Sequence, residues 1–518
     1  MMPSITNRNV TKYAAIAAFG GFVFGLDAAN LSGALRFVSS QFELNSLQVG
    51  TLVSCAIVGV IIALFFTGAL CEKFGRKKIL LAIALTYSLS TLLCAFAVSY
   101  EMLVIGRFIG GIAFASITVS AMYIGEIAPA DKRGRFVSIS QLLITLGSLT
   151  AFVVNYFFVK SMDQIAWLNN ENVWRFMLGF AFIANIVWVS TLMTIPESPR
   201  WLLKKHKDAQ ARLVFDKITP ENKIEELIAD VQLSNSEDAK NNPMAQLKTL
   251  FSRPMNYIVA VAVVYAIVQG ATGMNAVLFF APTVFEQIGM SVQDTFLQTV
   301  LLGAVAVVFT FVAIAFVEKW GRRFLTLGGL LLIVLAHSSI YYGFHTARYT
   351  IDQNAIEKIQ VQKIEVSQLE PFVGKKYTTD VALKKDLAQV YSKHDLPLVS
   401  GPIIKATIHI NAAFVLFGIF AFLAAFNLSV GPIMWVIFSE IFPNNVRSVA
   451  LPFAALVQSI SSYVIQQFFP WQLENMGAAN TFLNYGIVAL IGLVIMFFIL
   501  PETKGKTIEE LEAQLVKK

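Results

Sequence analysis

The chain contains about twelve apolar runs of about 20 residues each, and this series constrains its fold more than any other feature. A run of this length crosses the hydrocarbon core of a bilayer as an α-helix, because a helix satisfies its backbone hydrogen bonds internally. The predicted spans are residues 12–34, 48–70, 79–99, 102–124, 136–158, 174–195, 257–280, 295–317, 324–345, 408–438, 449–469 and 481–500. The sequence therefore predicts an all-α membrane protein with twelve transmembrane helices.

The charged residues are too few for a soluble protein of this size. They make up 14% of the chain, against about 25% in a soluble domain, and 56% of the residues are apolar. The net charge of +7 leaves nucleic-acid binding as an alternative. The Lys and Arg residues, however, lie in short loops between the apolar runs, as the positive-inside rule requires. We therefore expect a lipid bilayer as a partner and no nucleic acid.

The N-terminus has the outline of a signal peptide, with basic residues followed by an apolar run. We expect a retained first span instead, because no small-residue cleavage site precedes Asp27 and many further spans follow. If the spans alternate in direction, one side of the membrane carries the basic loops at 73–78, 131–135, 200–205 and 318–323. That side is predicted to be the cytoplasm, and both termini are predicted to lie there.

Short motifs at the ends of the spans repeat between the two halves of the chain. FGRKK after the second span returns as WGRR after the eighth, and EIAPADKRGR after the fourth returns as EIFPNNVR after the tenth. PESPR after the sixth span returns as PETKG after the twelfth. Two six-span halves in the same orientation are known among secondary transporters, with the substrate site between the halves. We predict such pseudo-symmetric halves at 1–196 and 257–518.

Two polar stretches interrupt this repeat. The first, at 197–256, is predicted to be a cytoplasmic linker with short helices, because ENKIEELIADVQ at 221–232 alternates apolar and acidic positions at helical spacing. The second, at about 346–404, accounts for the greater length of the second half and is predicted to be an extracytoplasmic insertion. We expect the insertion to be solvated decoration, meaning a solvent-exposed addition without a function of its own. A short cytoplasmic tail is predicted after the last span.

The order of these motifs resembles the sugar porter family of the major facilitator superfamily. The matching segments are GRKK at 75–78, GRF at 106–108, YIGEIAPADKRGR at 123–135, PESPRWL at 196–202, NAVLFFAP at 275–282, GPIMWVIFSEIFP at 431–443 and PETKGKTIEELE at 501–512. The chain is most similar to bacterial proton-coupled sugar symporters, such as those for xylose, and is similar also to eukaryotic glucose facilitators. The resemblance implies the major facilitator fold and transport of a sugar.

Charged residues at the predicted cytoplasmic helix ends form a candidate gate. Acids and bases from neighbouring helix ends can pair across each half. These ion pairs are shielded from water when this side is closed and exposed to water when it opens. Such pairs bias the conformational equilibrium by a few kcal/mol, the scale of partly desolvated ion pairs. The alternative is that they only enforce topology and solubility, whereas the resemblance implies gating. The residues are Arg76, Glu126, Arg133, Glu318, Arg322, Glu440 and Arg447.

One acidic residue, Asp27, falls inside the first predicted span. A charge near the middle of a bilayer costs about 3 kcal/mol and usually faces a partner in the bundle. In the first half, Arg107 in the fourth span is the only basic candidate at comparable depth. The two residues form either a permanent structural ion pair or a proton-coupling pair, in which protonation of Asp27 frees Arg107. The resemblance implies proton coupling, because proton-coupled members carry this acid and this arginine.

Amide and aromatic side chains within the spans predict a sugar site. Amides donate and accept hydrogen bonds to hydroxyl groups, and an aromatic ring covers the C–H face of a sugar. The alternative is that each amide joins helix to helix and each ring is ordinary packing. The resemblance places in one cavity the residues Phe24, Gln141, Gln269, Asn275, Phe279, Phe280, Trp435 and Gln458.

Several positions depart from the family pattern toward smaller or less polar side chains. Gly270 stands where a second glutamine is usual, Phe279 and Phe280 where tyrosines are common, Ser148 where a further glutamine is common, and Ser459 where tryptophan often follows the glutamine. Each lost polar partner removes about 1 kcal/mol of net hydrogen bonding. We therefore expect a roomier and less polar cavity than in the xylose transporters.

The combined prediction is a monosaccharide:proton symporter of a bacterial cytoplasmic membrane, working as a monomer by alternating access. A passive sugar or polyol facilitator and a non-transporting sugar sensor are the alternatives. His337 and His409 are expected to make helix contacts rather than relay protons. No metal-ligand cluster, phosphate loop or nucleophile arrangement is found, so we expect no cofactor, no metal and no enzymatic activity.

Overall fold

The computed structural model describes residues 5–128, 133–162, 164–219, 224–225, 228, 243–361, 366–392, 396–443, 445–506 and 508–516. Within these residues, twelve helical spans are long and apolar enough to cross a membrane. The predicted class of fold, an all-α protein with twelve transmembrane helices, is therefore confirmed.

Three of these spans, the fourth, seventh and tenth, are each divided into two helices. The first half comprises α1 (Ile5–Gln41), α2 (Ser46–Phe74), α3 (Arg76–Ala95), α4 (Tyr100–Ala113) with α5 (Ser116–Ile127), α6 (Arg133–Ser161) and α7 (Val173–Leu192). The second half comprises α12 (Asn256–Ala271) with α13 (Met274–Gln287), α14 (Val292–Trp320), α15 (Arg322–His345), α19 (Ala412–Leu428) with α20 (Val430–Ile441), α21 (Arg447–Asn475) and α22 (Gly477–Ile499).

The division of the seventh span follows from a single glycine. Gly273 has a φ of +88°, in the left-handed region that glycine adopts without a steric penalty. A Cβ at this position would also lie 2.9 Å from the ring of Tyr485. A helix cannot continue through such a residue, so the chain changes direction between α12 and α13. Residues on the two sides of this break consequently face the same neighbouring helix.

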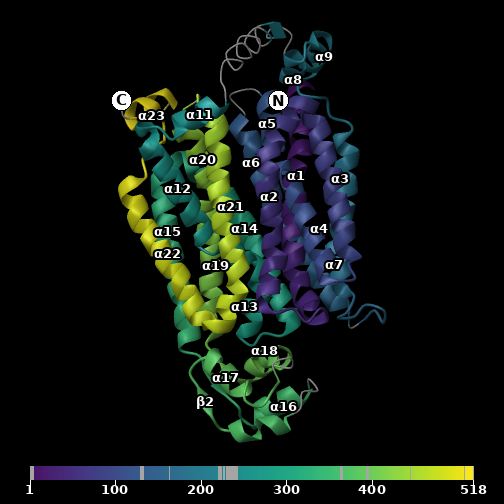
Figure 1. The fold of residues 1–518 in the computed structure, drawn as a ribbon, viewed down its shortest axis with the longest axis vertical. Helices are drawn as coiled ribbons and strands as arrows, with labels where there is room; N and C mark the ends of the chain where they lie inside the picture. Colours follow the sequence, from purple (N-terminus) through teal and green to yellow (C-terminus); the bar gives the residue numbers. More distant parts are fainter. Residues whose placement is uncertain are drawn as a thin grey trace.

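Each half packs mainly on itself. In the first half α1 packs against α6 and α7, and in the second half α15 packs against α19 and α22. Across the halves, α2 packs against α21 and α6 packs against α14. In Figure 1 the purple and blue helices of the first half lie beside the green and yellow helices of the second. The interface between the halves is therefore formed mainly by α2 and α6 on one side and by α14 and α21 on the other.

Short helices gather at one end of the bundle. They are α8 (Pro199–Lys204), α9 (Asp208–Ile218), α11 (Pro243–Leu250), the 3-10 turn η3 (Arg253–Met255) and α23 (Ile508–Leu515). Both chain termini lie at this end, which is called the termini end below (Figure 1). The segment 221–232, predicted to be an amphipathic helix, lies largely outside the described residues.

The polar insertion forms a small folded unit at the opposite end, called the insertion end (Figure 1). A three-stranded antiparallel sheet runs in the order β2 (Lys376–Tyr377), β1 (Arg348–Thr350), β3 (Ile408–His409), with Tyr349 opposite both Tyr377 and Ile408. Its helices are α16 (Gln353–Val361), η4 (Ser367–Phe372), α17 (Asp380–Leu387) and α18 (Leu396–Thr407). These elements enclose their own apolar core, which includes Tyr349, Ile359, Leu383 and Ile403. The insertion is therefore a folded unit with its own core, and its predicted role as solvated decoration stays a prediction.

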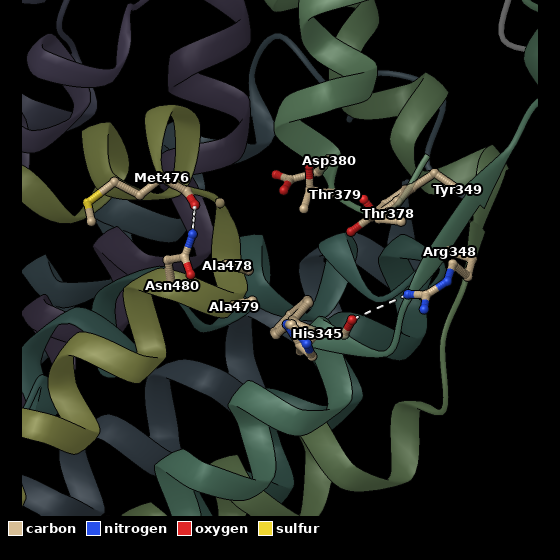
Figure 2. Close-up of a pocket in the computed structure, with 12 residues that line it drawn as sticks. His345, Arg348, Tyr349, Thr378, Thr379, Asp380, Met476, Ala478, Ala479 and Asn480 are labelled. Atoms are coloured by element: carbon tan, nitrogen blue, oxygen red, sulfur yellow. Dashed lines mark hydrogen bonds between the residues drawn. The ribbon is translucent and has the colours of Figure 1, made fainter. Parts of the chain in front are cut away.

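The insertion rests on the ends of α15 and α22. A cavity of about 320 Å³ lies at this junction, between Arg348 and Asp380 of the insertion and Asn480 of α22. Figure 2 shows these side chains around the cavity, with Arg348 donating to the carbonyl of His345 and Asn480 to that of Met476. The junction thus combines polar side chains with apolar ones such as Phe344 and Met476, at the ends of two membrane helices of the second half.

Candidate transport site

An ion pair between Asp27 of α1 and Arg107 of α4 lies inside the first half. Nη1 of Arg107 donates to Oδ2 of Asp27 at 2.5 Å. The side chain of Arg107 is 1% exposed and that of Asp27 is 14% exposed. Because an unpaired charge inside a span is costly, each group stabilises the other. The structure thus brings together the two residues that the sequence analysis had paired.

This pair leaves polar groups of Arg107 without a protein partner. Its Nε and Nη2 atoms are buried, and no hydrogen bond to either is found among the described residues. Buried donors are normally satisfied by ordered water or by a ligand. Phe24, predicted to line the cavity, lies one turn before Asp27 and packs edge-on against Phe114, with ring centroids 4.5 Å apart. The surroundings of Asp27 therefore combine an aromatic wall with unused hydrogen-bonding capacity.

Three of the predicted amides meet in the second half. Nε2 of Gln458 donates to Oε1 of Gln269 at 3.0 Å and to the hydroxyl of Ser462 at 2.9 Å. Nδ2 of Asn275 donates to the same hydroxyl at 3.0 Å. Gln269 precedes the break in the seventh span and Asn275 follows it, so both segments converge on α21. The sequence analysis missed Ser462, although its place one helical turn after Gln458 was the available signal.

The other predicted sugar-site residues have differing exposures. Trp435 on α20 is 43% exposed. Gln141 on α6 is half-buried, and no described hydrogen bond joins it to the three amides. Phe279 and Phe280 are 7% and 2% exposed, and Phe280 packs against Phe469 with ring centroids 5.1 Å apart. Trp435 and Gln141 thus have accessible surface, whereas the two phenylalanines belong to the core.

Two of the residues that depart from the family pattern, Gly270 and Ser148, lie against neighbouring helices. A Cβ at Gly270 would lie 2.8 Å from the Cβ of Ser461, so this glycine lets α12 pack closely on α21. The hydroxyl of Ser148 is buried and donates to the carbonyl of Gly25 at 3.1 Å. At Gly270 the space that a shorter side chain leaves is therefore occupied by α21, contrary to the expectation of a roomier cavity. At Ser148 the expectation stays a prediction.

The two halves meet at the insertion end. Arg36 near the end of α1 forms an ion pair with Glu286 near the end of α13. The hydroxyl of Ser54 on α2 donates to Oε1 of Gln467 on α21 at 2.7 Å. A Cβ at Gly50 would lie 2.0 Å from the carbonyl oxygen of Gln467, so the two backbones approach closely. These contacts hold the bundle closed at this end.

Charged groups at the termini end pair within the first half. Arg76 at the start of α3 contacts Glu126 and Glu72, each at 2.8 Å. Glu197, which follows the sixth span, accepts the backbone N–H of Arg76 at 2.8 Å. This contact needs a glycine before it, because a Cβ at Gly75 would lie 2.3 Å from Oε2 of Glu197 and the φ of Gly75 is +96°. One carboxylate thus joins the ends of α2 and α3 to the segment after α7.

The second half repeats this arrangement. Arg322 at the start of α15 contacts Glu440 and Glu318, each at 2.8 Å. Glu502 accepts the backbone N–H of Arg322 at 3.0 Å, beside Gly321 with its φ of +85°. Glu197 and Glu502 were not among the predicted gate residues. The repeated PES and PET sequences were the signal that could have identified them.

Two further predicted gate residues have different surroundings. Arg447 at the start of α21 donates to the carbonyl of Phe442 from Nη2 at 2.8 Å and from Nε at 3.2 Å. Arg133 begins α6, but its side chain lies outside the described part of the structure. The ion pairs of Arg76 and Arg322 each stay within one half. At the termini end, therefore, these ion pairs of Arg76 and Arg322 hold each half together.

The sequence matches the family described as "Sugar (and other) transporter" over residues 13–358 and 398–515. The D-xylose-proton symporter of Escherichia coli (strain K12) is 30% identical over 532 residues, covering 96% of this chain and 94% of the relative. The arabinose-proton symporter of Bacillus subtilis (strain 168) is 27% identical over 507 residues, covering 97% and 94%. The middle of the insertion, residues 359–397, lies outside the family match.

Solved structures agree with these relatives. The xylose transporter XylE from E. coli in an inward open conformation superposes with a TM-score of 0.74 at 27% identity, covering 98% of this chain and 100% of that one. The proton:xylose symporter XylE bound to 6-bromo-6-deoxy-D-glucose gives a TM-score of 0.73 at 27% identity, with the same coverage. The fold of the two halves is thus that of a major facilitator transporter.

Proposed function

The chain belongs to the sugar transporter family, and from this premise we propose that it imports a monosaccharide, a pentose or a hexose, together with a proton. The observation that carries the proposal is the ion pair of Asp27 and Arg107 inside the first half. The membrane is proposed to be the cytoplasmic membrane of a bacterium, with both termini in the cytoplasm, which the distribution of Lys and Arg in the loops supports. The chain is proposed to act as a monomer.

Asp27 is proposed as the proton carrier. When the carboxylate is protonated it loses its charge, and its attraction for Arg107 falls, which frees the guanidinium to find other partners. Deprotonation on the opposite side restores the pair. One charge moving down about 100 mV supplies about 2.3 kcal/mol. A pH difference adds about 1.4 kcal/mol per unit. Together these terms suffice for a tenfold or greater accumulation of a neutral solute.

The sugar is proposed to bind between the halves. Gln269, Asn275 and Gln458 share hydrogen bonds, so their amides are held where one ring can reach them all. Trp435 is the proposed aromatic cover, since its ring is 43% exposed. The remaining proposed contacts are Phe24, Gln141, Phe279 and Phe280. The two phenylalanines would act through the shape of the cavity, because both are buried.

Alternating access is proposed to occur by movement of residues 1–196 against residues 257–518. The contacts of Arg36 with Glu286 and of Ser54 with Gln467 join the halves at the insertion end. At the termini end, the ion pairs of Arg76 and of Arg322 each stay within one half. This distribution supports a conformation closed on the insertion side and open toward the cytoplasm. Opening on the other side requires the insertion-end contacts to break.

The test is uptake of labelled xylose, glucose, galactose and inositol by the purified protein in liposomes with an alkaline interior. We expect accumulation of at least one sugar above its outside concentration. We expect Asp27→Asn to equilibrate that sugar without accumulating it, because the variant cannot exchange a proton. Glu171→Gln, which changes an exposed acid in the loop between α6 and α7, is the matched control and should accumulate sugar normally.

Equilibration by the wild-type protein regardless of the pH gradient would identify a passive facilitator, in which Asp27 and Arg107 are a structural pair. Sugar binding without any flux would identify a sensor. Either outcome rejects proton symport.

A further inference from the structure

A buried histidine lies at the break in the seventh span. His337 of α15 has no exposed surface, and its Nε2 atom is 3.0 Å from the carbonyl oxygen of Thr272, between α12 and α13. The imidazole ring packs against Phe422 at 4.5 Å and Tyr485 at 6.1 Å between ring centroids. Tyr485 is also the residue that a Cβ at Gly273 would strike. The break is thus enclosed by α15 and α22 together.

The carbonyl of Thr272 needs a donor because the helix breaks beside it. In a continuous helix it would accept the N–H of the residue four positions later. The helix restarts instead with the carbonyl of Gly273, which accepts the N–H of Val277 at 2.9 Å. Among the described residues, the carbonyl of Thr272 has no backbone donor, and Thr272 itself is completely buried. A buried carbonyl without a donor is destabilising, so the Nε2–H group of His337 supplies what the broken helix lacks.

The same residues connect to the amides of the sugar site. The hydroxyl of Thr272 donates to the carbonyl of Gln269 at 3.0 Å, which ties the break to the last turn of α12. Asn275 lies in the first turn of α13. The angle between the two helices therefore decides whether Gln269 and Asn275 reach α21 at the same time. A contact that fixes the break also fixes the relative position of these two amides.

We propose that His337 is a positioning residue for sugar binding, acting as a neutral Nε2–H donor that holds the break in the geometry required by Gln269 and Asn275. This inference rests on the proposed function for the identity of the ligand. Proton relay is a different role and would need a second partner for the ring. Nδ1 of His337 is buried and has no hydrogen-bond partner among the described residues. The ring therefore holds the break without extending a chain of hydrogen bonds.

The first test compares two substitutions by uptake kinetics in liposomes. His337→Phe keeps a ring among the aromatic neighbours but removes the donor, and we expect the KM for the transported sugar to rise about tenfold with little change in kcat. His337→Gln keeps an N–H donor at similar reach and should return the KM to within about twofold of wild type. His345→Phe changes an exposed histidine of the same helix and is the matched control. A wild-type KM in His337→Phe would overturn the proposal.

The second test uses the wild-type protein, so it does not depend on the folding of a variant. Nitrogen-15 spectra of the histidine-labelled protein, with the His337 signals assigned by their loss in His337→Gln, report which ring nitrogen carries the proton. We expect a neutral ring protonated on Nε2, and a proton on Nδ1 alone would overturn the proposal. If the wild-type protein moves no sugar, the proposed function fails, while this spectrum still decides whether His337 donates to the break.

Discussion

Arg107 is 1% exposed while its partner Asp27 keeps 14% of its side-chain surface exposed, so only the acidic member of this buried pair is accessible. A proton can thus reach the carboxylate without the guanidinium being exposed. This asymmetry matches the roles proposed for the two residues, with Asp27 changing its charge and Arg107 keeping it. It also means that the two substitutions should have different consequences.

Arg107→Gln should destabilise the protein by about 3 kcal/mol, because it leaves the charge of Asp27 without its partner. Thermal unfolding in detergent measures this loss. The double variant Asp27→Asn with Arg107→Gln should recover part of the stability, since no unpaired charge remains. Losses that simply add in the double variant would show that the two side chains do not interact.

Gly75→Ala should destabilise the termini end by about 1–3 kcal/mol, because Gly75 occupies a backbone region that is nearly exclusive to glycine. A Cβ there would also displace the carboxylate of Glu197 from the backbone of Arg76. We expect a lower unfolding temperature and slower sugar uptake. Gly68→Ala on α2, the helix that ends just before Gly75, is the control, since no atom lies within 4 Å of its Cβ position. Equal effects of the two substitutions would contradict the assigned role of Gly75.

Gly50→Trp should prevent closure at the insertion end, because even a Cβ at this position would overlap the carbonyl oxygen of Gln467. We expect the variant to fold, to lose sugar uptake and to show a longer distance between spin labels on α2 and α21 at that end. Gly68→Trp, on the same helix with open space around it, should keep its uptake. Unchanged spin-label distances in Gly50→Trp would show that the halves do not meet through this glycine.

The insertion should lose stability in acid through Asp386. The Lys375 ammonium group and the hydroxyl of Tyr377, which donates at 3.0 Å, hold the pKa of Asp386 below its ordinary value of 3.8. Because the folded pKa is the lower one, the stabilisation is present above pH 3.8 and is lost as the pH falls through the lowered pKa. Limited proteolysis of the insertion across acidic pH measures this loss. Asp386→Asn should flatten the pH dependence, and an unchanged profile would contradict the assignment.

The sequence by itself determined the number of spans, their approximate limits and the pairing of Asp27 with Arg107. These features depend on local physical properties. A bilayer of given thickness requires a run of given length, and a charge inside a span needs an opposite charge at the same depth. The repeated motifs likewise marked Arg76, Glu126, Arg322 and Glu440 as charges at equivalent helix ends, and the structure showed that Arg76 pairs with Glu126 and Arg322 with Glu440.

Only the tertiary structure decided how helices distant in sequence face one another. It brought Ser462 between Gln458 and Asn275, filled the space beside Gly270 with Ser461, and set His337 against the break at Thr272. Each of these contacts depends on the rotation of one helix against another and on the direction of the chain after Gly273. Apolar composition is nearly the same on all faces of a membrane helix, so periodicity carries little information about which face is packed. Which face of a helix is packed is decided by close contacts between side chains and backbones, and these contacts exist only once the bundle has formed.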